Sequence, residues 1–298
     1  MARYLVAPEE VGARADRILA SRLPEFSRRQ IRELFLDGAV MIGDRPVSKS
    51  HLVARGDELR LVVSVEVGPP EEPEASLDLR WQSQEIVVVH KPAGQACAMR
   101  KIGERGTLVG AIAQRFPEVR RVGYSPWEPG LLHRLDTGTT GLVVVARSQR
   151  AFKKLRGALT RGDLLKEYLA VVEAEGLPER GTIIGDLRPH PRNRRRVRVE
   201  TGDAGAERRT RYQVLLRRGR WALLGVEVKA AYRHQVRAHL AHLGHPLAGD
   251  TLYGGLRVPG LERHALHAAR VTWSGDEDLG GFDVRADAPD DLRAFWER

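Results

Sequence analysis

The segment EVGPPEEPEAS, from Glu66 to Ser76, constrains most strongly how this 298-residue chain can fold. It contains three prolines and four glutamates and has no apolar periodicity, so it favours an extended connection over a helix or strand. A chain of this length can bury a full core and can hold one large domain and one small one. We therefore expect a small N-terminal unit, a linker and a large C-terminal domain, at residues 1–65, 66–78 and 79–298.

The charge of the chain indicates a polyanionic partner. Lysine and arginine total 49 against 39 acids, which gives a net charge of +10, and arginine greatly outnumbers lysine. Guanidinium groups pair bidentately with phosphate and release condensed counterions, so such a balance favours nucleic acid. An arginine-rich proteome would give the same composition, so the positions of the arginines have to decide between the two.

Several classes of protein are not expected. No run approaches the roughly 20 apolar residues of a membrane helix. The first residues, MARYLVAPEEVGARADR, carry charges where a secretory signal needs an apolar core, so we expect a cytoplasmic protein without a membrane partner. The single cysteine, Cys97, excludes an internal disulfide and a cysteine-based zinc cluster.

The N-terminal unit is predicted to be a compact helix and hairpin. In SRRQIRELFLDG, Ser27 is placed as an N-cap with Gln30 three residues later, which is the spacing of a capping box, and Gly38 ends the helix. AVMIGDRPV then predicts two short strands around a Gly-Asp turn, and GDELRLVV predicts another strand. Three arginines fall on the first turn and exposed side of the helix: Arg28, Arg29 and Arg32. They are candidates to contact nucleic acid, although a basic helix can also be only a solvated face.

The large domain combines many strands with a few helices. Strands are predicted in LRWQSQEIVVVHKPAG, KEYLAVVEA and RYQVLLRRGRWALLGVEVKA, and helices in GTLVGAIAQRF, SQRAFKKLRGALTRG, RHQVRAHLAHLG and APDDLRAFWER. Because strands and helices do not alternate regularly, the pattern favours an α+β fold with a mixed, largely antiparallel sheet.

One aspartate stands out in LLHRLDTGTTGLVVVAR, residues 131–147. Asp136 lies between two apolar runs that we interpret as buried strands, directly after His133, Arg134 and Leu135. An Asx turn or an N-cap would explain a lone aspartate here, whereas the basic neighbours and the small, hydroxyl-rich loop favour a functional role. Farther along, Arg237 lies at the edge of the apolar stripe of a predicted helix, where it can reach a partly buried anion.

The same predicted helix carries a group of histidines. His239 and His242 lie three residues apart, and His245 follows the helix. No acid lies beside them, and histidines in this pattern more often form hydrogen bonds than bind zinc. We expect no metal site.

Taken together, these motifs resemble those of the RluA/RluD-type RNA pseudouridine synthases. HRLD, followed by Thr139-Thr140-Gly141 and an apolar strand, is similar to the signature of that family. The other blocks follow in family order: VVVHKPAG, KEYLAVV, HQVRAHLAHLGHPLAGDTLYGG and LHA. The N-terminal unit resembles the alpha-L RNA-binding motif that a small-subunit ribosomal protein shares with several RNA-modifying enzymes.

The resemblance implies the isomerisation of uridine to pseudouridine in structured RNA without a metal or organic cofactor. The RNA can be ribosomal or transfer RNA, of which we favour ribosomal RNA, and we expect a monomer. It implies that Asp136 is the catalytic carboxylate, that Arg237 pairs with it, and that Tyr168 lies against the target base and helps to remove its proton. Residues implied to support the site or to contact RNA are Arg134, His133 and Lys91. The basic run LRPHPRNRRRVR, residues 187–198, is a candidate RNA-binding hairpin.

Two departures from the family pattern lie near these residues. Thr137-Gly138 replaces a pair that is usually charged, and Ala230-Ala231-Tyr232-Arg233 replaces Thr-Gly-Arg-Thr. They keep open the alternative of a catalytically silent RNA-binding protein on the same scaffold. A glycoside hydrolase would need a second carboxylate across the cleft, and the sequence near Asp136 shows none.

Overall fold

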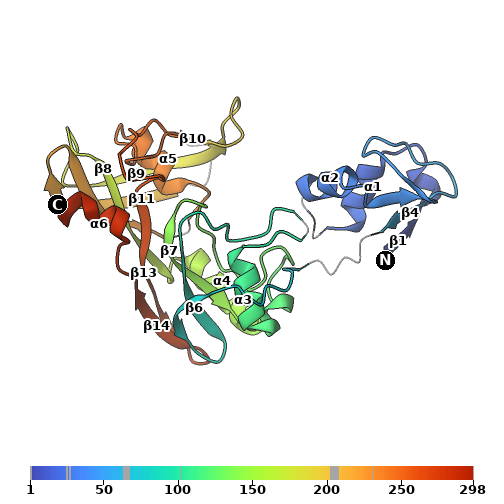
Figure 1. Cartoon of the computed structure of the whole chain (residues 1–298), viewed down its shortest axis with the longest axis horizontal. Helices are drawn as coiled ribbons and strands as arrows, with labels where there is room; N and C mark the ends of the chain where they lie inside the picture. Colours follow the sequence, from blue (N-terminus) through green and yellow to red (C-terminus); the bar gives the residue numbers. More distant parts are fainter. Residues whose placement is uncertain are drawn as a thin grey trace.

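The computed structural model describes residues 2–24, 26, 28–62, 68–101, 103–201, 208–229 and 231–297 (Figure 1). Within these ranges no helix has the length and apolar character that crossing a membrane would require.

The N-terminal unit is a four-stranded antiparallel sheet with two helices. The sheet has the order β1-β4-β2-β3. Its elements are β1 Ala2–Leu5, α1 Ala15–Arg22, α2 Arg28–Leu36, β2 Val40–Ile42, β3 Arg45–Pro46 and β4 Glu58–Leu61, with a short 3₁₀ turn at Pro8–Glu10. The expected helix and hairpin are present, and β1 is an additional strand. The expected cap, Ser27, lies outside the described residues. Ile31 and Leu34 of α2 are buried and join the core of this unit.

The rest of the chain is built on one sheet of ten strands. Its order is β10-β9-β11-β12-β8-β13-β7-β6-β5, and β14 pairs with β13. The strands are β5 Asp78–Gln82, β6 Ile86–Lys91, β7 Thr140–Ala146, β8 Leu165–Glu173, β9 Arg180–Pro189, β10 Val197–Glu200, β11 Arg208–Arg218, β12 Trp221–Val228, β13 Leu266–Gly275 and β14 Gly280–Arg285. Among the described strands only β13 and β7 pair in parallel. The predicted mixed, largely antiparallel α+β fold is confirmed.

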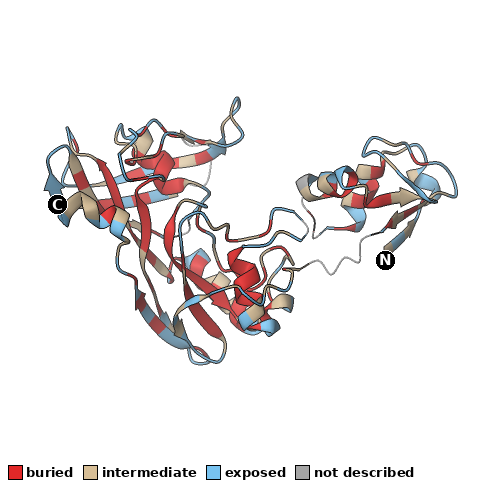
Figure 2. Ribbon diagram, in the orientation of Figure 1, coloured by how far each residue is buried: buried red, intermediate tan, exposed pale blue. Residues whose placement is uncertain are grey.

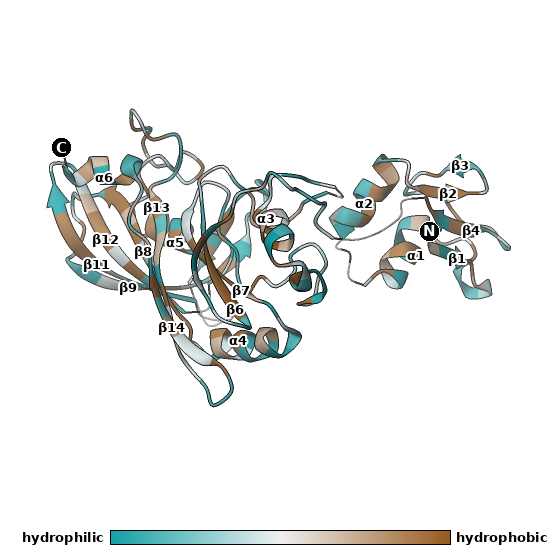
Figure 3. Cartoon of the chain, turned by 60° about the horizontal axis from the view of Figure 1, so that its bottom comes forward, coloured by the Kyte–Doolittle hydropathy of each residue, from teal (hydrophilic) through white to brown (hydrophobic). Residues whose placement is uncertain are grey.

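Helices cover both faces of the sheet around β6 and β7. These helices are α3 Leu108–Arg115 and α4 Gln149–Arg161, with a 3₁₀ turn at Pro117–Arg121 after α3, whereas α5 Gln235–His242 lies against β9, β10 and β11 and α6 Asp290–Glu297 lies near β11. Alternate residues of β6 enter different cores: Val87 packs with Ile112 of α3, and Val88 packs with Leu155 of α4. Because both faces are covered, residues 86–89 of β6 and 142–146 of β7 are continuously apolar (Figures 2 and 3).

The expected strand at Leu131–Leu135 is wrong. Only Leu131 forms an isolated bridge, to Val145, and the chain beyond it is irregular. The imidazole of His133 accepts the Val144 N–H, which a strand carbonyl would otherwise accept. The segment therefore reaches Asp136 as a buried loop beside β7.

The described part of the expected linker, residues 68–76, contains no helix or strand and includes one turn, in which the Ala75 N–H donates to the Glu72 carbonyl at 2.9 Å. It is bound to the large domain. The Glu72 carboxylate accepts the Gly106 N–H at 2.7 Å, and its own N–H donates to Gln114 at 3.1 Å. Arg105 donates to the Glu71 carbonyl at 2.9 Å. These contacts hold the segment before β5 against the start of α3.

Candidate active site

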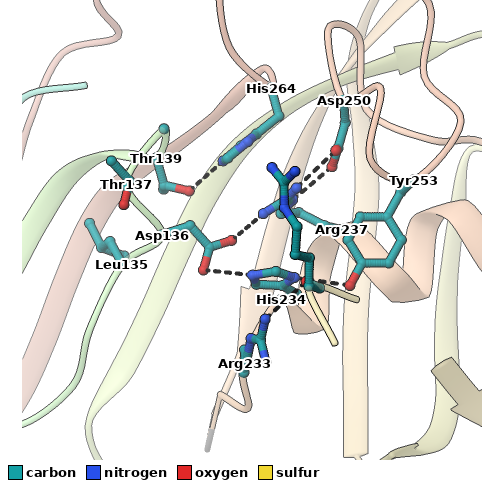
Figure 4. Close-up of polar contacts among 12 residues, drawn as sticks. Leu135, Asp136, Thr137, Thr139, Arg233, His234, Arg237, Asp250, Tyr253 and His264 are labelled. Carbon is teal, nitrogen blue, oxygen red and sulfur yellow. Dashed lines mark hydrogen bonds and ion pairs between the residues drawn. The ribbon is translucent and has the colours of Figure 1, made fainter. Parts of the chain in front are cut away.

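Asp136 lies in a cleft between the loop before β7 and the start of α5. Its Oδ2 accepts a hydrogen bond from Nη1 of Arg237 at 2.8 Å (Figure 4). Arg134, Tyr168 and His234 also line this cleft. The carboxylate of Asp136 therefore accepts a hydrogen bond from a residue 101 positions away in the sequence, and does not form the local Asx turn or N-cap.

Arg237 is held in place by a second carboxylate. Its Nε and Nη2 donate to the two oxygens of Asp250 at 2.7 and 2.9 Å, and Asp250 is buried. Although burial lowers it, the hydrogen bonds that Arg237 donates to Asp250 and the negative charge of Asp136 raise the pKa of Arg237. With both oxygens committed to Arg237, Asp250 is not available as the second acid of a glycoside hydrolase.

The surroundings of Asp136 keep it ionised. Burial alone would raise the pKa of this carboxyl, but the charge that His234 carries when it is protonated at acidic pH, the permanent charge of Arg237 and the Arg237 hydrogen bond outweigh it, so the pKa lies below its usual value. At neutral pH the group is a carboxylate that faces the cleft. Such a group can act as a nucleophile or can stabilise a developing positive charge.

Tyr168 lies on β8 with its side chain buried at the cleft. Burial and the negative charge of Asp136 raise its pKa well above the usual value of tyrosine, so its hydroxyl stays protonated. The position suits contact with a base. The expected help in proton removal is disfavoured, because a neutral phenol is a poor base.

Lys91 is buried beside the loop that carries Asp136. Its ammonium is fully buried at the end of β6 and donates to the carbonyls of Pro92, Gln95 and Thr137 at 2.7, 3.0 and 3.2 Å. Burial lowers the pKa of Lys91 to about 8. The contact with Thr137 fixes the residue after Asp136, so Lys91 supports the site from below.

His133 and Arg134 point in different directions. Burial lowers the pKa of His133 well below its usual value, and its neutral ring accepts the Val144 N–H at 3.3 Å. An RNA contact by His133 is therefore corrected to a structural contact with β7. Arg134 is exposed, forms an ion pair with Glu128 at 3.0 Å and lines the cleft, so it remains available to a nucleotide.

Two threonine–histidine pairs hold the loop after Asp136. Thr139 Oγ1 lies 2.7 Å from Nε2 of His264, and Thr140 Oγ1 lies 2.8 Å from Nδ1 of His267. A Cβ on Gly138 would lie 3.0 Å from the His264 ring, closer than most such contacts allow. The small residue at position 138 therefore fits the neighbouring histidine, which gives this departure from the family pattern a local cause.

The second departure borders a basic hairpin. As expected, the run at 187–198 forms a hairpin, from β9 and β10. Arg233 donates from Nη2 to the carbonyls of Arg194 and Arg195 at 3.2 and 2.9 Å, so it holds the hairpin tip. Ala230 lies outside the described residues. His234, which directly follows Arg233, has φ +56°, in the left-handed region.

The remaining candidates are the histidines near α5 and the arginines of α2. Among the described residues no group of three histidine, cysteine or acidic side chains is arranged to hold a metal. His239 contacts Thr210, and His245 contacts the Glu173 carbonyl. Arg28 and Arg32 of α2 are exposed, and the side chain of Arg29 is outside the described part.

Three important residues were not singled out from the sequence: Asp250, His234 and Tyr253. All three lie within the block HQVRAHLAHLGHPLAGDTLYGG, and Asp250 follows Arg237 by thirteen residues. The presence of an acid and a tyrosine in this block was the available signal. Their partners become visible only in the fold, because the loop after α5 returns to the start of that helix.

Comparison with known proteins gives one consistent result. A family model described as RNA pseudouridylate synthase matches residues 85–242. A relative from Xylella fastidiosa, named ribosomal large subunit pseudouridine synthase D, is 34% identical over 86% of this chain and 80% of its own. An RNA pseudouridine synthase of Chloroflexus aurantiacus is 36% identical over 89% of this chain and 83% of its own. The structure of human RNA pseudouridylate synthase domain containing 1 has a TM-score of 0.59 at 24% identity, over 76% of this chain and 90% of that one.

Proposed function

Because this chain belongs to the RNA pseudouridylate synthase family and is an RNA pseudouridine synthase, we propose that it isomerises uridines of ribosomal RNA with Asp136 as the catalytic carboxylate. The observation that carries the proposal is the chain of contacts from Asp250 through Arg237 to Asp136, at 2.7 to 2.9 Å. These contacts hold the ionised carboxylate of Asp136 at the cleft in a fixed orientation, so the reacting group is preorganised.

The reaction explains why such a group is needed. The bond from N1 of uracil to C1′ of ribose breaks, the base rotates and a bond from C5 to C1′ forms. The proton on C5 then leaves and N1 takes up a proton, so the product is an isomer of the substrate. Asp136 can attack the ring or C1′, or assist the departure of the base from C1′. In each route its negative charge has to be present at the start, and Arg237 preserves it.

A target uridine has to leave its stack to reach this cleft, which costs a few kcal/mol. Arg134 lies at the exposed edge of the cleft, where it can occupy or hold the displaced position. Tyr168 lies deeper, where its ring can contact the flipped base. We assign these two residues to base displacement and base contact.

Two basic surfaces support ribosomal RNA as the substrate. One is the β9–β10 hairpin with Arg192, Arg194 and Arg195, and the other is α2 of the N-terminal unit, which we propose to be an alpha-L RNA-binding module. Relatives that align over most of this chain are named for the large ribosomal subunit. Extended basic surfaces fit a large, structured RNA, because each phosphate contact adds salt-sensitive affinity.

The test is a pseudouridine map of total RNA from cells that lack the gene, complemented with the wild type or with Asp136→Asn. The proposal predicts that one or more pseudouridines of large-subunit RNA disappear and return only with the wild type. Loss confined to transfer RNA would refute the substrate. Restoration by Asp136→Asn would refute the role of the carboxylate, and an unchanged map in the deletion strain would favour the silent RNA-binding alternative.

A further inference from the structure

His234 is held in an unusual backbone conformation at the edge of the site. It is the N-cap residue of α5, and among the described non-glycine residues it alone has a positive φ. A side chain in this region costs of order 1 kcal/mol and persists where its surroundings require it. The result is that the imidazole lies between two groups: Nε2 is 3.6 Å from Oδ1 of Asp136, and Nδ1 is 3.0 Å from the Tyr253 hydroxyl (Figure 4).

The hydrogen bonds of Tyr253 determine where the imidazole proton lies. The Tyr253 oxygen already accepts the N–H of Val197 at 2.9 Å. Its own hydrogen needs an acceptor, and within the described residues the available one is Nδ1 of His234. A neutral imidazole carries one proton, so it is on Nε2, which faces Asp136.

The imidazole is neutral at physiological pH. Burial lowers the pKa of His234, and Arg237 and Arg233 lower it further. Asp136 and Asp250 act in the opposite direction without overcoming burial. His234 therefore offers Asp136 a neutral N–H, whereas Arg237 offers it a permanent charge.

We propose that His234 is a positioning residue for Asp136 and that Tyr253 fixes its tautomer. Arg237 holds Oδ2 of the carboxylate, and Nε2–H of His234 closes on Oδ1 when a nucleotide fills the cleft. At 3.6 Å the free protein has an electrostatic contact that tightens to a hydrogen bond in the substrate complex, as contacts in unliganded active sites commonly do. The inference rests on the proposed role of Asp136.

Tyr253 also connects this contact to the basic hairpin. Val197 opens β10, and the guanidinium groups of Arg196 and Arg237 each lie 5.1 Å from the centre of the Tyr253 ring. If the hairpin moves away, the Tyr253 oxygen loses the Val197 N–H and is free to accept from Nδ1 instead. The tautomer that donates to Asp136 therefore depends on the contact between the hairpin and Tyr253, and RNA bound to the hairpin stabilises this contact.

The first test needs neither RNA nor activity. The ring nitrogens of ¹⁵N-histidine-labelled protein are observed by NMR, and the His234 signals are assigned from their loss in His234→Gln. The proposal predicts the Nε2–H tautomer in the wild type and a shift toward Nδ1–H in Tyr253→Phe, which keeps the ring but loses the hydroxyl. An Nδ1–H tautomer in the wild type, or an identical His234 spectrum in Tyr253→Phe, would overturn it.

The second test separates positioning from folding. Tyr253→Phe should lower kcat about 10-fold and leave KM for RNA within about 2-fold, because the lost contact orients the Asp136 carboxylate and does not itself hold the RNA. His234→Gln, whose amide can donate from the place of Nε2, should retain more activity than His234→Leu. Tyr212→Phe is the control, because Tyr212 is equally buried in β11 outside the cleft, and it should leave kcat unchanged. Equal losses in Gln and Leu variants would contradict the proposal, whereas inactivity of Asp136→Asn concerns only the proposed function.

Discussion

Arg237 is bound more extensively by Asp250 than by Asp136. Asp250 accepts from Nε at 2.7 Å and from Nη2 at 2.9 Å, and Asp136 accepts from Nη1 at 2.8 Å. A guanidinium held on two of its nitrogens cannot rotate, so its remaining donor has a fixed direction. Asp250, which does not face the substrate, thus positions Asp136 through Arg237.

Asp250→Asn should therefore impair catalysis, although the side chain at this position does not contact the RNA. A loss of alignment of about 1 Å can cost of order 100-fold in rate, so we expect kcat to fall 10- to 100-fold. The matched variant Arg237→Lys keeps the charge but cannot contact both acids, and it should fall at least as far. Single-turnover rates at saturating enzyme measure both. An Asp250→Asn variant with the wild-type rate would show that the pair of hydrogen bonds between Arg237 and Asp250 is not needed.

Gly138→Ala should reduce activity with little loss of stability. The new Cβ would lie 3.0 Å from the His264 ring, so the imidazole or the loop has to shift, and the loop carries Asp136. We expect a several-fold lower kcat. Gly280→Ala is the control, because its Cβ would meet nothing within 4 Å. Equal kcat in the two variants would contradict the tight fit.

Lys166→Met should stabilise the protein at pH 7. Burial, with the charge of Arg156, lowers the pKa of Lys166 to about 8. Below pH 8 its charge is retained at a cost in the folded state, and between about pH 8 and 10 the unfolded chain binds more protons, so the free energy of unfolding rises with pH. Removing a poorly compensated buried charge should add about 1–3 kcal/mol at pH 7 and flatten that rise.

Urea unfolding at pH 7, 8, 9 and 10 measures this effect. Part of the slope should persist in Lys166→Met, because burial also lowers the pKa of Lys91 to about 8. A variant that is less stable than the wild type at pH 7, with an unchanged slope, would show that Lys166 is compensated in the folded state.

Charge reversal of Arg28, Arg29 and Arg32 should weaken RNA binding and lower the steepness of its salt dependence, if α2 contacts phosphates. Filter binding at 50 to 200 mM salt measures both quantities. Arg285→Glu is the control, because this arginine is exposed on β14 of the large domain, outside both proposed RNA surfaces. Equal affinities for the triple variant and the control would remove the N-terminal unit from RNA recognition.

Much of the fold was predictable because local patterns reflect burial. The runs 86–89 in β6 and 142–146 in β7 are apolar at every position, which identifies strands covered on both faces. The helices α3 and α4 have N-cap residues, Thr107 and Ser148, that accept hydrogen bonds from their own first turns. The apolar segment 131–135 was misjudged for the same reason. Burial is visible in a sequence, whereas the partner of each backbone group is not, and here a side chain replaced a strand.

The site was predictable in part, through the resemblance of separate blocks. Family motifs identified Asp136 and Arg237 as partners although they lie 101 residues apart. The contacts of Thr139 with His264 and of Arg237 with Asp250 join residues whose roles no single block reveals. For Lys91 the sequence left support of the site and contact with RNA open, because a lysine in a motif does not show whether its ammonium faces solvent or three carbonyls.

The role of the Asp136 carboxylate can be measured as the release of the C5 hydrogen from RNA labelled at C5 of uridine, with purified wild type and Asp136→Asn compared at equal RNA occupancy. We expect the wild type to release the label in proportion to the pseudouridine formed. Asp136→Asn should bind the RNA within about 3-fold of the wild-type affinity but release no label above background, because the amide is isosteric but carries no charge. Continued release by Asp136→Asn at more than about one hundredth of the wild-type rate would contradict the central claim that the Asp136 carboxylate performs the reaction.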